Sequence, residues 1–255
     1  IVGSRFEFDN HKSKNFDLLD KDYSFFTDDT VMTAAVAEAL IMAKKKKGDL
    51  GAYAAKCLRR WGNKYPFMDY GISFEKWLFN RNAAAYNSWG NGAAMRVSPC
   101  GLAAGSLEEA MILSRRVTEI THNHPEGLKG AEAVAVAVYL AKVGKNKEQI
   151  RNYVAQNYYE INFRLDDIRE SYGFDESCQG SVPQALAAFF EAKDFEDSIR
   201  NAISVGGDSD TIAAIAGGVA EAYYGVPETI RNEVVGYLDQ DLLEVIKKFY
   251  ECFAT

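Results

Sequence analysis

The sequence predicts an all-α fold, built as one domain over residues 1–255, and three observations support this prediction. Apolar residues recur at intervals of three and four along most of the chain, as they do on the buried face of an amphipathic helix. Strict alternation of apolar and polar residues, which is typical of a half-buried strand, is nearly absent. No stretch rich in Pro, Gly or Ser divides the chain, so we expect a single compact multi-helix domain.

Helix signals begin in the first quarter of the chain. An apolar stripe at helical spacing covers Val31–Ala43. The lysines at 44–47 and the glycine that follows them, Gly48, are typical of a solvated helix end. A second helix is expected over Leu50–Tyr65, because its apolar residues follow the same period up to a proline.

Clearer start signals follow in the rest of the chain. Ser106 and Glu109 have the spacing of a capping box ahead of a third helix. Asp194 suits an N-cap, while Pro183 and Pro227 suit the first turn of a helix. The apolar pattern predicts further helices over Ala131–Val143, Lys147–Asn157, Pro183–Glu191, Asp194–Val205, Thr211–Tyr224, Pro227–Leu238 and Leu242–Phe253.

Composition limits the classes of function. Apolar residues make up 47% and charged residues 25% of the chain, which is typical of a soluble globular protein. The longest apolar stretches, Ala131–Val143 and Ile212–Val219, are shorter than the roughly 18–20 residues of a membrane span, so no membrane association is expected. The net charge of −7 disfavours direct binding to nucleic-acid backbones, although a metal-bridged anionic ligand stays compatible with it.

The cysteines indicate the compartment. No two of them have the spacing of zinc ligands or of a redox motif, and nothing indicates a disulfide framework. We therefore expect a reducing, cytoplasmic location. No signal-peptide pattern opens the sequence, but it begins at Ile1 without a methionine, so targeting stays open.

Two acidic motifs stand at the starts of two predicted helices. They are Thr27-Asp28-Asp29-Thr30 and Gly207-Asp208-Ser209-Asp210-Thr211. The simplest interpretation is helix capping, which needs only one side-chain acceptor for each helix. Each motif carries two carboxylates, and adjacent aspartates repel each other unless a cation or hydrogen bonds compensate. If the two helix starts converge, their oxygens would suit one or two ions of Mg²⁺, Mn²⁺ or Ca²⁺.

Three motifs carry a family resemblance. Thr27-Asp28-Asp29-Thr30 is followed by Gly90-Asn91-Gly92-Ala93-Ala94-Met95-Arg96 and then by Gly206-Gly207-Asp208-Ser209-Asp210-Thr211-Ile212-Ala213. In this order they resemble the ADP-ribosylglycohydrolase family, which includes dinitrogenase reductase-activating glycohydrolase and its eukaryotic relatives. The resemblance runs from Gly3-Ser4-Arg5-Phe6-Glu7 to Ala222-Tyr223-Tyr224-Gly225 and covers most of the chain.

The resemblance implies a binuclear Mg²⁺ or Mn²⁺ centre between helix N-termini in an all-α domain. One ion would be held by Thr27, Asp28, Asp29 and Asp210. The other would be held by Asp208, Asp210 and Thr211, with Asp210 bridging the two. Glu7 matches a family glutamate on a mobile loop beside the distal ribose. The resemblance therefore makes it a candidate for positioning ribose or water and for proton transfer. Without the resemblance, Glu7 would be interpreted as a surface charge.

The resemblance also suggests where substrate binds. Ser88-Trp89-Gly90-Asn91-Gly92 is similar to the family loop for diphosphate and ribose, where small residues would expose backbone N–H groups to phosphate oxygens. His122 and Ser181 match family positions near the ligand, and with too few partners at suitable spacing His122 is a poor zinc ligand. Arg96 suits a phosphate or a structural ion pair equally. For adenine, the stacking candidates are Trp77, Trp89 and Phe6, although core packing is the commoner fate of an aromatic side chain.

The implied activity is hydrolysis of the glycosidic bond at the distal ribose of an ADP-ribosylated protein or small-molecule conjugate, with release of ADP-ribose. The catalytic candidates are Glu7, Asp28, Asp29, Asp208 and Asp210. Two alternatives stay open: a binuclear metallophosphoesterase that cuts the diphosphate, and a non-catalytic ADP-ribose-binding or crystallin-like protein. Segment 65–85 is aromatic and charged, matches no family residue, and is a candidate specificity loop. The acceptor group, the choice between Mg²⁺ and Mn²⁺ and the oligomeric state are not determined by these motifs.

Overall fold

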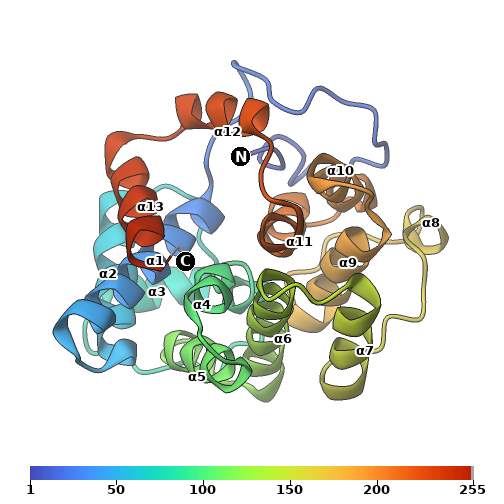
Figure 1. Cartoon of the computed structure of the whole chain (residues 1–255). Helices are drawn as coiled ribbons and strands as arrows, with labels where there is room; N and C mark the ends of the chain where they lie inside the picture. Colours follow the sequence, from blue (N-terminus) through green and yellow to red (C-terminus); the bar gives the residue numbers. More distant parts are fainter. Residues whose placement is uncertain (254–255) are drawn as a thin grey trace.

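Helices form the whole regular structure of residues 1–253, which are the residues that the computed structural model describes (Figure 1). Within this range there is no strand, and one isolated antiparallel bridge joins Gly90 to Ser177. The expected all-α fold is confirmed. The α-helices are α1 (Asp28–Lys46), α2 (Leu50–Lys64), α3 (Ile72–Phe79), α4 (Ser98–Ala103), α5 (Leu107–Thr118), α6 (Pro125–Lys142), α7 (Lys147–Asn157), α8 (Leu165–Ile168), α9 (Cys178–Glu191), α10 (Phe195–Val205), α11 (Ser209–Tyr224), α12 (Glu228–Val234) and α13 (Gln240–Phe253). Two 3₁₀ helices, η1 (Asn91–Ala93) and η2 (Val235–Tyr237), complete the elements.

The core is built around α6 and α11. The helix α6 packs against α4, α5, α7, α9 and α11, and α11 packs against α1, α4, α6, α9 and α10. Alanine, valine and glycine dominate the buried positions of α6, so neighbouring helices approach it closely. At Gly101 of α4, for example, a β-carbon would lie 2.3 Å from the carbonyl oxygen of Ala135. This close packing sets the position of the start of α11 relative to α1.

Several predicted boundaries are corrected. The helix α9 begins at Cys178, so Pro183 lies inside it and not in its first turn. Pro227 is the N-cap of α12, one position earlier than expected. At α5, Ser106 Oγ accepts from the N–H of Glu109 at 3.1 Å, but the Glu109 carboxylate accepts from Gly105 at 2.7 Å, so only half of the capping box forms. Asp194 caps α10 as expected.

Segment 65–85 is partly helical. It contains α3, which buries Phe74, Trp77 and Leu78 and packs against α2. These apolar positions have helical spacing, but the run is too short to stand out from the aromatic and charged residues around it. The guanidinium of Arg59 lies 3.9 Å from the centroid of the Trp77 ring and covers it. This part of the chain is therefore packed against the helical core.

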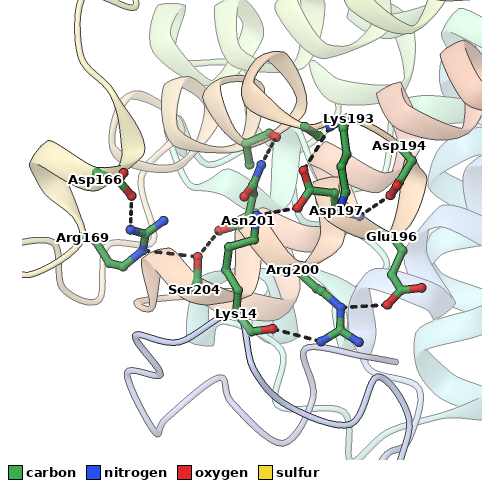
Figure 2. Close-up of polar contacts among 12 residues, drawn as sticks. Lys14, Asp166, Arg169, Lys193, Asp194, Glu196, Asp197, Arg200, Asn201 and Ser204 are labelled. Carbon is green, nitrogen blue, oxygen red and sulfur yellow. Dashed lines mark hydrogen bonds and ion pairs between the residues drawn. The ribbon is translucent and has the colours of Figure 1, made fainter.

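The N-terminal segment crosses α10 and the start of α11 before α1 begins (Figure 1). Lys12 Nζ donates to the carbonyl oxygens of Tyr172 and Val205, at 2.6 and 2.7 Å. Figure 2 shows the next contacts, in which Lys14 pairs with Asp197 and Arg200 donates to the carbonyl of Lys14 at 3.0 Å. These contacts join side chains or carbonyl groups of Lys12 and Lys14 to Val205, Asp197 and Arg200 of α10, and they fix this part of the N-terminal segment to that helix.

Two further expectations concern the whole chain. All four cysteines, Cys57, Cys100, Cys178 and Cys252, carry free thiols. Among residues 1–253, none of the helices has both the length and the apolar character that a membrane crossing requires.

Candidate metal centre and active site

The starts of α1 and α11 meet, and their aspartates form one cluster. Carboxylate oxygens of Asp28, Asp29 and Asp210 lie within 4.8 Å of one another, and so do those of Glu7, Asp208 and Asp210. Asp210 belongs to both groups. The convergence on which the metal hypothesis depends is therefore present in the fold.

The side chains of the two motifs do not cap their helices. Thr27 and Asp208 are the N-caps of α1 and α11, and neither side chain accepts from its helix. Side chains do cap α2, α5, α6, α7, α9 and α10. At the cluster the hydroxyl groups turn toward Asp29 instead, where Thr27 Oγ1 donates to Oδ2 at 3.1 Å and Thr211 Oγ1 donates to Oδ1 at 3.3 Å. The capping interpretation is wrong for these two motifs.

Electrostatics make the cluster unfavourable without a cation. Burial, followed by the negative charge of Asp210, raises the pKa of Asp28, Asp29 and Asp208 well above the usual value for aspartate. None of the ion pairs within residues 1–253 involves these carboxylates or that of Asp210. Neither a lysine nor an arginine therefore neutralises them directly.

An unpaired atom tests whether divalent cations fit here. Asp210 Oδ1 is buried and has no hydrogen-bond partner among residues 1–253. A buried carboxylate oxygen is costly when it is left unsatisfied, and a metal ion would satisfy it. Because the surrounding donors are carboxylates and hydroxyls, the cluster suits a hard cation such as Mg²⁺ or Mn²⁺ and is unsuited to soft metals.

Glu7 is held at this cluster by close packing of the N-terminal segment. A β-carbon at Gly3 would lie 2.5 Å from Cα of Asp210, so only glycine allows this approach. Ser209 Oγ also donates to the carbonyl of Phe6, at 3.4 Å. Burial raises the pKa of Glu7 to about 7, with smaller contributions from Asp210, Asp69 and Glu176. The alternative of an isolated surface charge does not fit this position.

The predicted substrate loop lies beside the start of α9. The N–H of Asn91 donates to the carbonyl of Glu176 at 2.7 Å, and that of Cys178 to the carbonyl of Trp89 at 2.9 Å. The N–H of Gly90 donates to Ser88 Oγ at 3.0 Å. The amides of Gly90 and Asn91 are therefore already used, and the expectation that they are open to phosphate is wrong for this conformation.

Asn91 and Ser181 contact the acidic cluster. Asn91 Nδ2 donates to Asp208 Oδ2 at 2.6 Å and to Ser181 Oγ at 3.0 Å. Ser181 Oγ in turn donates to the carbonyl of Asp175 at 2.8 Å. Both side chains are buried, so in this conformation they hold Asp208 in place and do not face solvent.

The other residues predicted to contact substrate differ in how exposed their side chains are. Trp89 is 51% exposed, with its ring 5.3 Å from that of His124, so it is open to a stacking partner. Phe6 and Trp77 are buried, which is the core packing named as the commoner fate. Arg96 is only 1% exposed and forms no ion pair within residues 1–253, so of its two predicted roles the ion pair is excluded.

Three residues of this region were not predicted. Asp69 and Glu176 act on the pKa of Glu7 from two other segments, and Thr121 bonds to both Arg96 and His122. Asp69 and Glu176 reach the site through tertiary packing alone, whereas Thr121 directly precedes the predicted residue His122 in the sequence. Because the charge of Asp69 acts on Glu7, part of segment 65–85 lies near Glu7.

The sequence of this chain matches one known protein family along its whole length. A family model described as ADP-ribosylglycohydrolase matches residues 1–255. The ADP-ribosylhydrolase ARH3 of Homo sapiens is 29% identical over an alignment of 282 positions, gaps included, which covers 86% of this chain and 77% of that protein. An uncharacterized protein of Archaeoglobus fulgidus is 31% identical over an alignment of 253 positions, which covers 89% of this chain and 80% of that protein.

Two further matches extend the comparison. The ADP-ribosylarginine hydrolase Tri1 of Pseudomonas putida is 28% identical over an alignment of 230 positions, which covers 79% of this chain and 59% of that protein. A solved structure described as an ADP-ribosylglycohydrolase-related protein complex superposes with a TM-score of 0.72 at 23% identity. The superposition covers 98% of this chain and 92% of the other, and it shows a shared fold.

Proposed function

Because the chain belongs to the ADP-ribosylglycohydrolase family, we propose that it is a metal-dependent hydrolase of ADP-ribosylated substrates. It cleaves the glycosidic bond at the distal ribose of a modified protein or small-molecule conjugate and releases ADP-ribose. The observation that carries this proposal is the cluster of four aspartates at two helix starts, of which Asp29, Asp208 and Asp210 are buried and Asp28 is half-buried. One Asp210 oxygen has no hydrogen-bond partner within residues 1–253, and Glu7 lies beside the cluster. The names of two relatives, an ADP-ribosylhydrolase and an ADP-ribosylarginine hydrolase, are consistent with this chemistry.

Two Mg²⁺ or Mn²⁺ ions fit the donors of the cluster. Asp28, Asp29 and Asp210, with the Thr27 hydroxyl, would hold one ion, and Asp208, Asp210 and the Thr211 hydroxyl would hold the other. When bound, such ions orient ribose hydroxyls and lower the pKa of water.

The protein side chains supply charge and proton transfer. Glycosidic cleavage develops positive charge on the ribose ring, which nearby carboxylates stabilise. A carboxyl group with a pKa of about 7 exchanges a proton readily at neutral pH, so Glu7 Oε suits the transfer between water and the leaving group. Asn91 Nδ2 donates to Asp208 Oδ2 at 2.6 Å and so fixes the position of this carboxylate beside Asp210 and Glu7.

Release of free ADP-ribose from defined conjugates tests the proposal. The panel contains arginine-, serine- and acetyl-linked ADP-ribose, each assayed in Mg²⁺, in Mn²⁺ and in EDTA. We expect release only with a divalent ion, and loss of release in the Asp208→Asn/Asp210→Asn double variant. The control variant is Asp9→Asn, which removes an exposed carboxylate from the same N-terminal segment and should leave the rate unchanged.

The products separate the alternatives. AMP with ribose phosphate would indicate a metallophosphoesterase and would contradict glycosidic cleavage. Calorimetric binding of ADP-ribose without turnover of any conjugate would support the non-catalytic alternative. Full activity in EDTA would remove the role of the metal cluster.

A further inference from the structure

Arg96 is a buried cation that forms no ion pair with an acidic residue of the described range, residues 1–253. Its side chain is 1% exposed, and although burial lowers its pKa to about 10, it stays charged at neutral pH. The guanidinium lies 5.3 Å from the centroid of the Phe74 ring, and one terminal nitrogen donates to Thr121 Oγ1 at 2.7 Å. Burying a charged arginine costs free energy of desolvation, and packing alone does not account for a charged side chain at this buried position.

The same guanidinium nitrogen faces one side of the His122 ring. It lies 3.5 Å from Nδ1, and Thr121 Oγ1 lies 2.8 Å from the same Nδ1. An arginine can only donate hydrogen bonds, so a proton on Nδ1 would point at another proton. The Thr121 hydroxyl has one hydrogen and two acceptors within reach, the carbonyl of Thr118 at 3.3 Å and Nδ1 at 2.8 Å. We assign the hydrogen to the shorter contact, in which the hydroxyl donates to the ring. Both neighbours therefore favour a lone pair on Nδ1.

The other ring nitrogen faces the substrate loop. A β-carbon at Gly92 would lie 3.4 Å from His122 Nε2, and one at Gly90 would lie 3.6 Å from it. If Nδ1 accepts, a neutral imidazole carries its proton on Nε2. Burial and the charge of Arg96 both lower the pKa of His122 well below its ordinary value, so the ring is neutral.

We propose that Arg96 is a positioning residue that holds His122 as the neutral tautomer with its proton on Nε2, directed at the turn formed by residues 90–92. There this N–H donates to an oxygen of the bound ADP-ribosyl group, a step that rests on the proposed function. The contact differs from an arginine–phosphate pair, because Arg96 stays buried and acts through Thr121 and His122. The loop amides of Gly90 and Asn91 are already occupied, so the imidazole supplies a donor that the backbone does not.

The tautomer is read directly by NMR of protein labelled with ¹⁵N-histidine. The chain has three histidines, and the His122→Gln variant assigns the signal that belongs to His122. In the metal-free wild type we expect a protonated Nε2 and an unprotonated Nδ1. A proton on Nδ1 in the wild type overturns the proposal, whatever the enzyme hydrolyses.

Variants then test the role of Arg96. Arg96→Lys keeps a cation with donors only, and Arg96→Met removes it at similar length. We expect Arg96→Lys to keep the Nε2 proton, while Arg96→Met shows both tautomers and raises the dissociation constant for ADP-ribose in Mg²⁺ about tenfold, as loss of a hydrogen bond to an anionic group predicts. An unchanged tautomer in Arg96→Met would contradict the assignment, because a merely structural arginine leaves the ring proton where it is.

Two variants of His122 test the proposal independently, should Arg96→Met fail to fold. The amide nitrogen of His122→Gln reaches the position of Nε2, whereas that of His122→Asn reaches only that of Nδ1. We expect His122→Gln to bind ADP-ribose within about threefold of the wild type and His122→Asn about tenfold more weakly, in line with one lost hydrogen bond. Equal weakening in both variants overturns the proposal. A wild type with the Nε2 proton that binds no ADP-ribose in Mg²⁺ would instead refute the proposed function, and the ligand contact with it.

Discussion

Replacing Glu7 with glutamine should stabilise the metal-free protein, and the gain should grow with pH. Burial of Glu7, with a smaller contribution from the negative charge of Asp210, raises its pKa from the ordinary value of 4.5 to about 7. Between these two values the folded state binds more protons than the unfolded state, so the free energy of unfolding falls as the pH rises through this window. Glutamine carries no charge at any pH, and Glu7→Gln therefore removes this loss.

The size of the effect follows from the pKa shift. At 1.36 kcal/mol for each pKa unit, a rise from 4.5 to about 7 corresponds to about 3 kcal/mol once Glu7 is ionised. The side chain is only half-buried, and solvent screening reduces this to about 1.5 kcal/mol at pH 8. At pH 5 the same reasoning leaves about 0.5 kcal/mol. For a chain of this size, the gain at pH 8 raises the melting temperature by about 3–6 °C.

Urea and thermal unfolding in EDTA at pH 5 and pH 8 measure the gain. Asp9→Asn is the matched control, because it removes an exposed carboxylate two residues away and should change stability by less than about 0.5 kcal/mol. Saturating Mg²⁺ should reduce the gain, since cations offset the charge of Asp210 that acts on Glu7. An equal effect of Glu7→Gln at the two pH values would refute the electrostatic reasoning.

Three other substitutions test the site. Asn91→Ala removes the hydrogen bond that Asn91 donates to Asp208 at 2.6 Å, and should lower the free energy of unfolding by about 1–3 kcal/mol, measured with urea in EDTA. An unchanged free energy of unfolding would mean that this hydrogen bond does not stabilise the fold. Gly3→Ala places a β-carbon 2.5 Å from Cα of Asp210 and should lower the rate of ADP-ribose release at least tenfold, whereas Gly236→Ala, which meets open space, should not change the rate. Asp210→Asn should raise the melting temperature in EDTA, because it relieves the repulsion among the carboxylates. The same variant should lose the stabilisation by Mg²⁺. For the wild type this stabilisation is about 2.7 kcal/mol at an ion concentration 100 times the dissociation constant. Equal stabilisation of Asp210→Asn and wild type by Mg²⁺ would place the ion elsewhere.

The helices that the sequence predicted are those with long apolar stripes. Such a stripe identifies one buried face over several turns, as in α10 and α13. The short helices α3, α4 and α8 were not predicted, because a few buried positions define no period. In α4 the buried residues are Pro99, Cys100 and Gly101, which by composition suggest a turn. Their helical form depends on packing against α6.

The acidic cluster was predictable from two motifs with more carboxylates than capping requires. What the sequence could not provide was the distance between them, since Thr211 and Asp29 are 182 positions apart and meet only through the helices between them. The environment of Arg96 was equally inaccessible, because Thr121 and Phe74 come from separate segments. A motif indicates which atoms are available, and tertiary packing decides which of them meet.

The convergence of α1 and α11 has a consequence for the kinetics of unfolding. An ion shared by Asp29 and Asp210 would act as a reversible cross-link that closes a loop of about 180 residues between the two helix starts. By the chain-entropy model, a permanent link over this span would destabilise the unfolded ensemble by on the order of 5 kcal/mol. Separation of the two helices would then require release of the ion first. Divalent cations should therefore slow global opening and proteolysis, and the exchange rate of the ion would set the lifetime of the native chain.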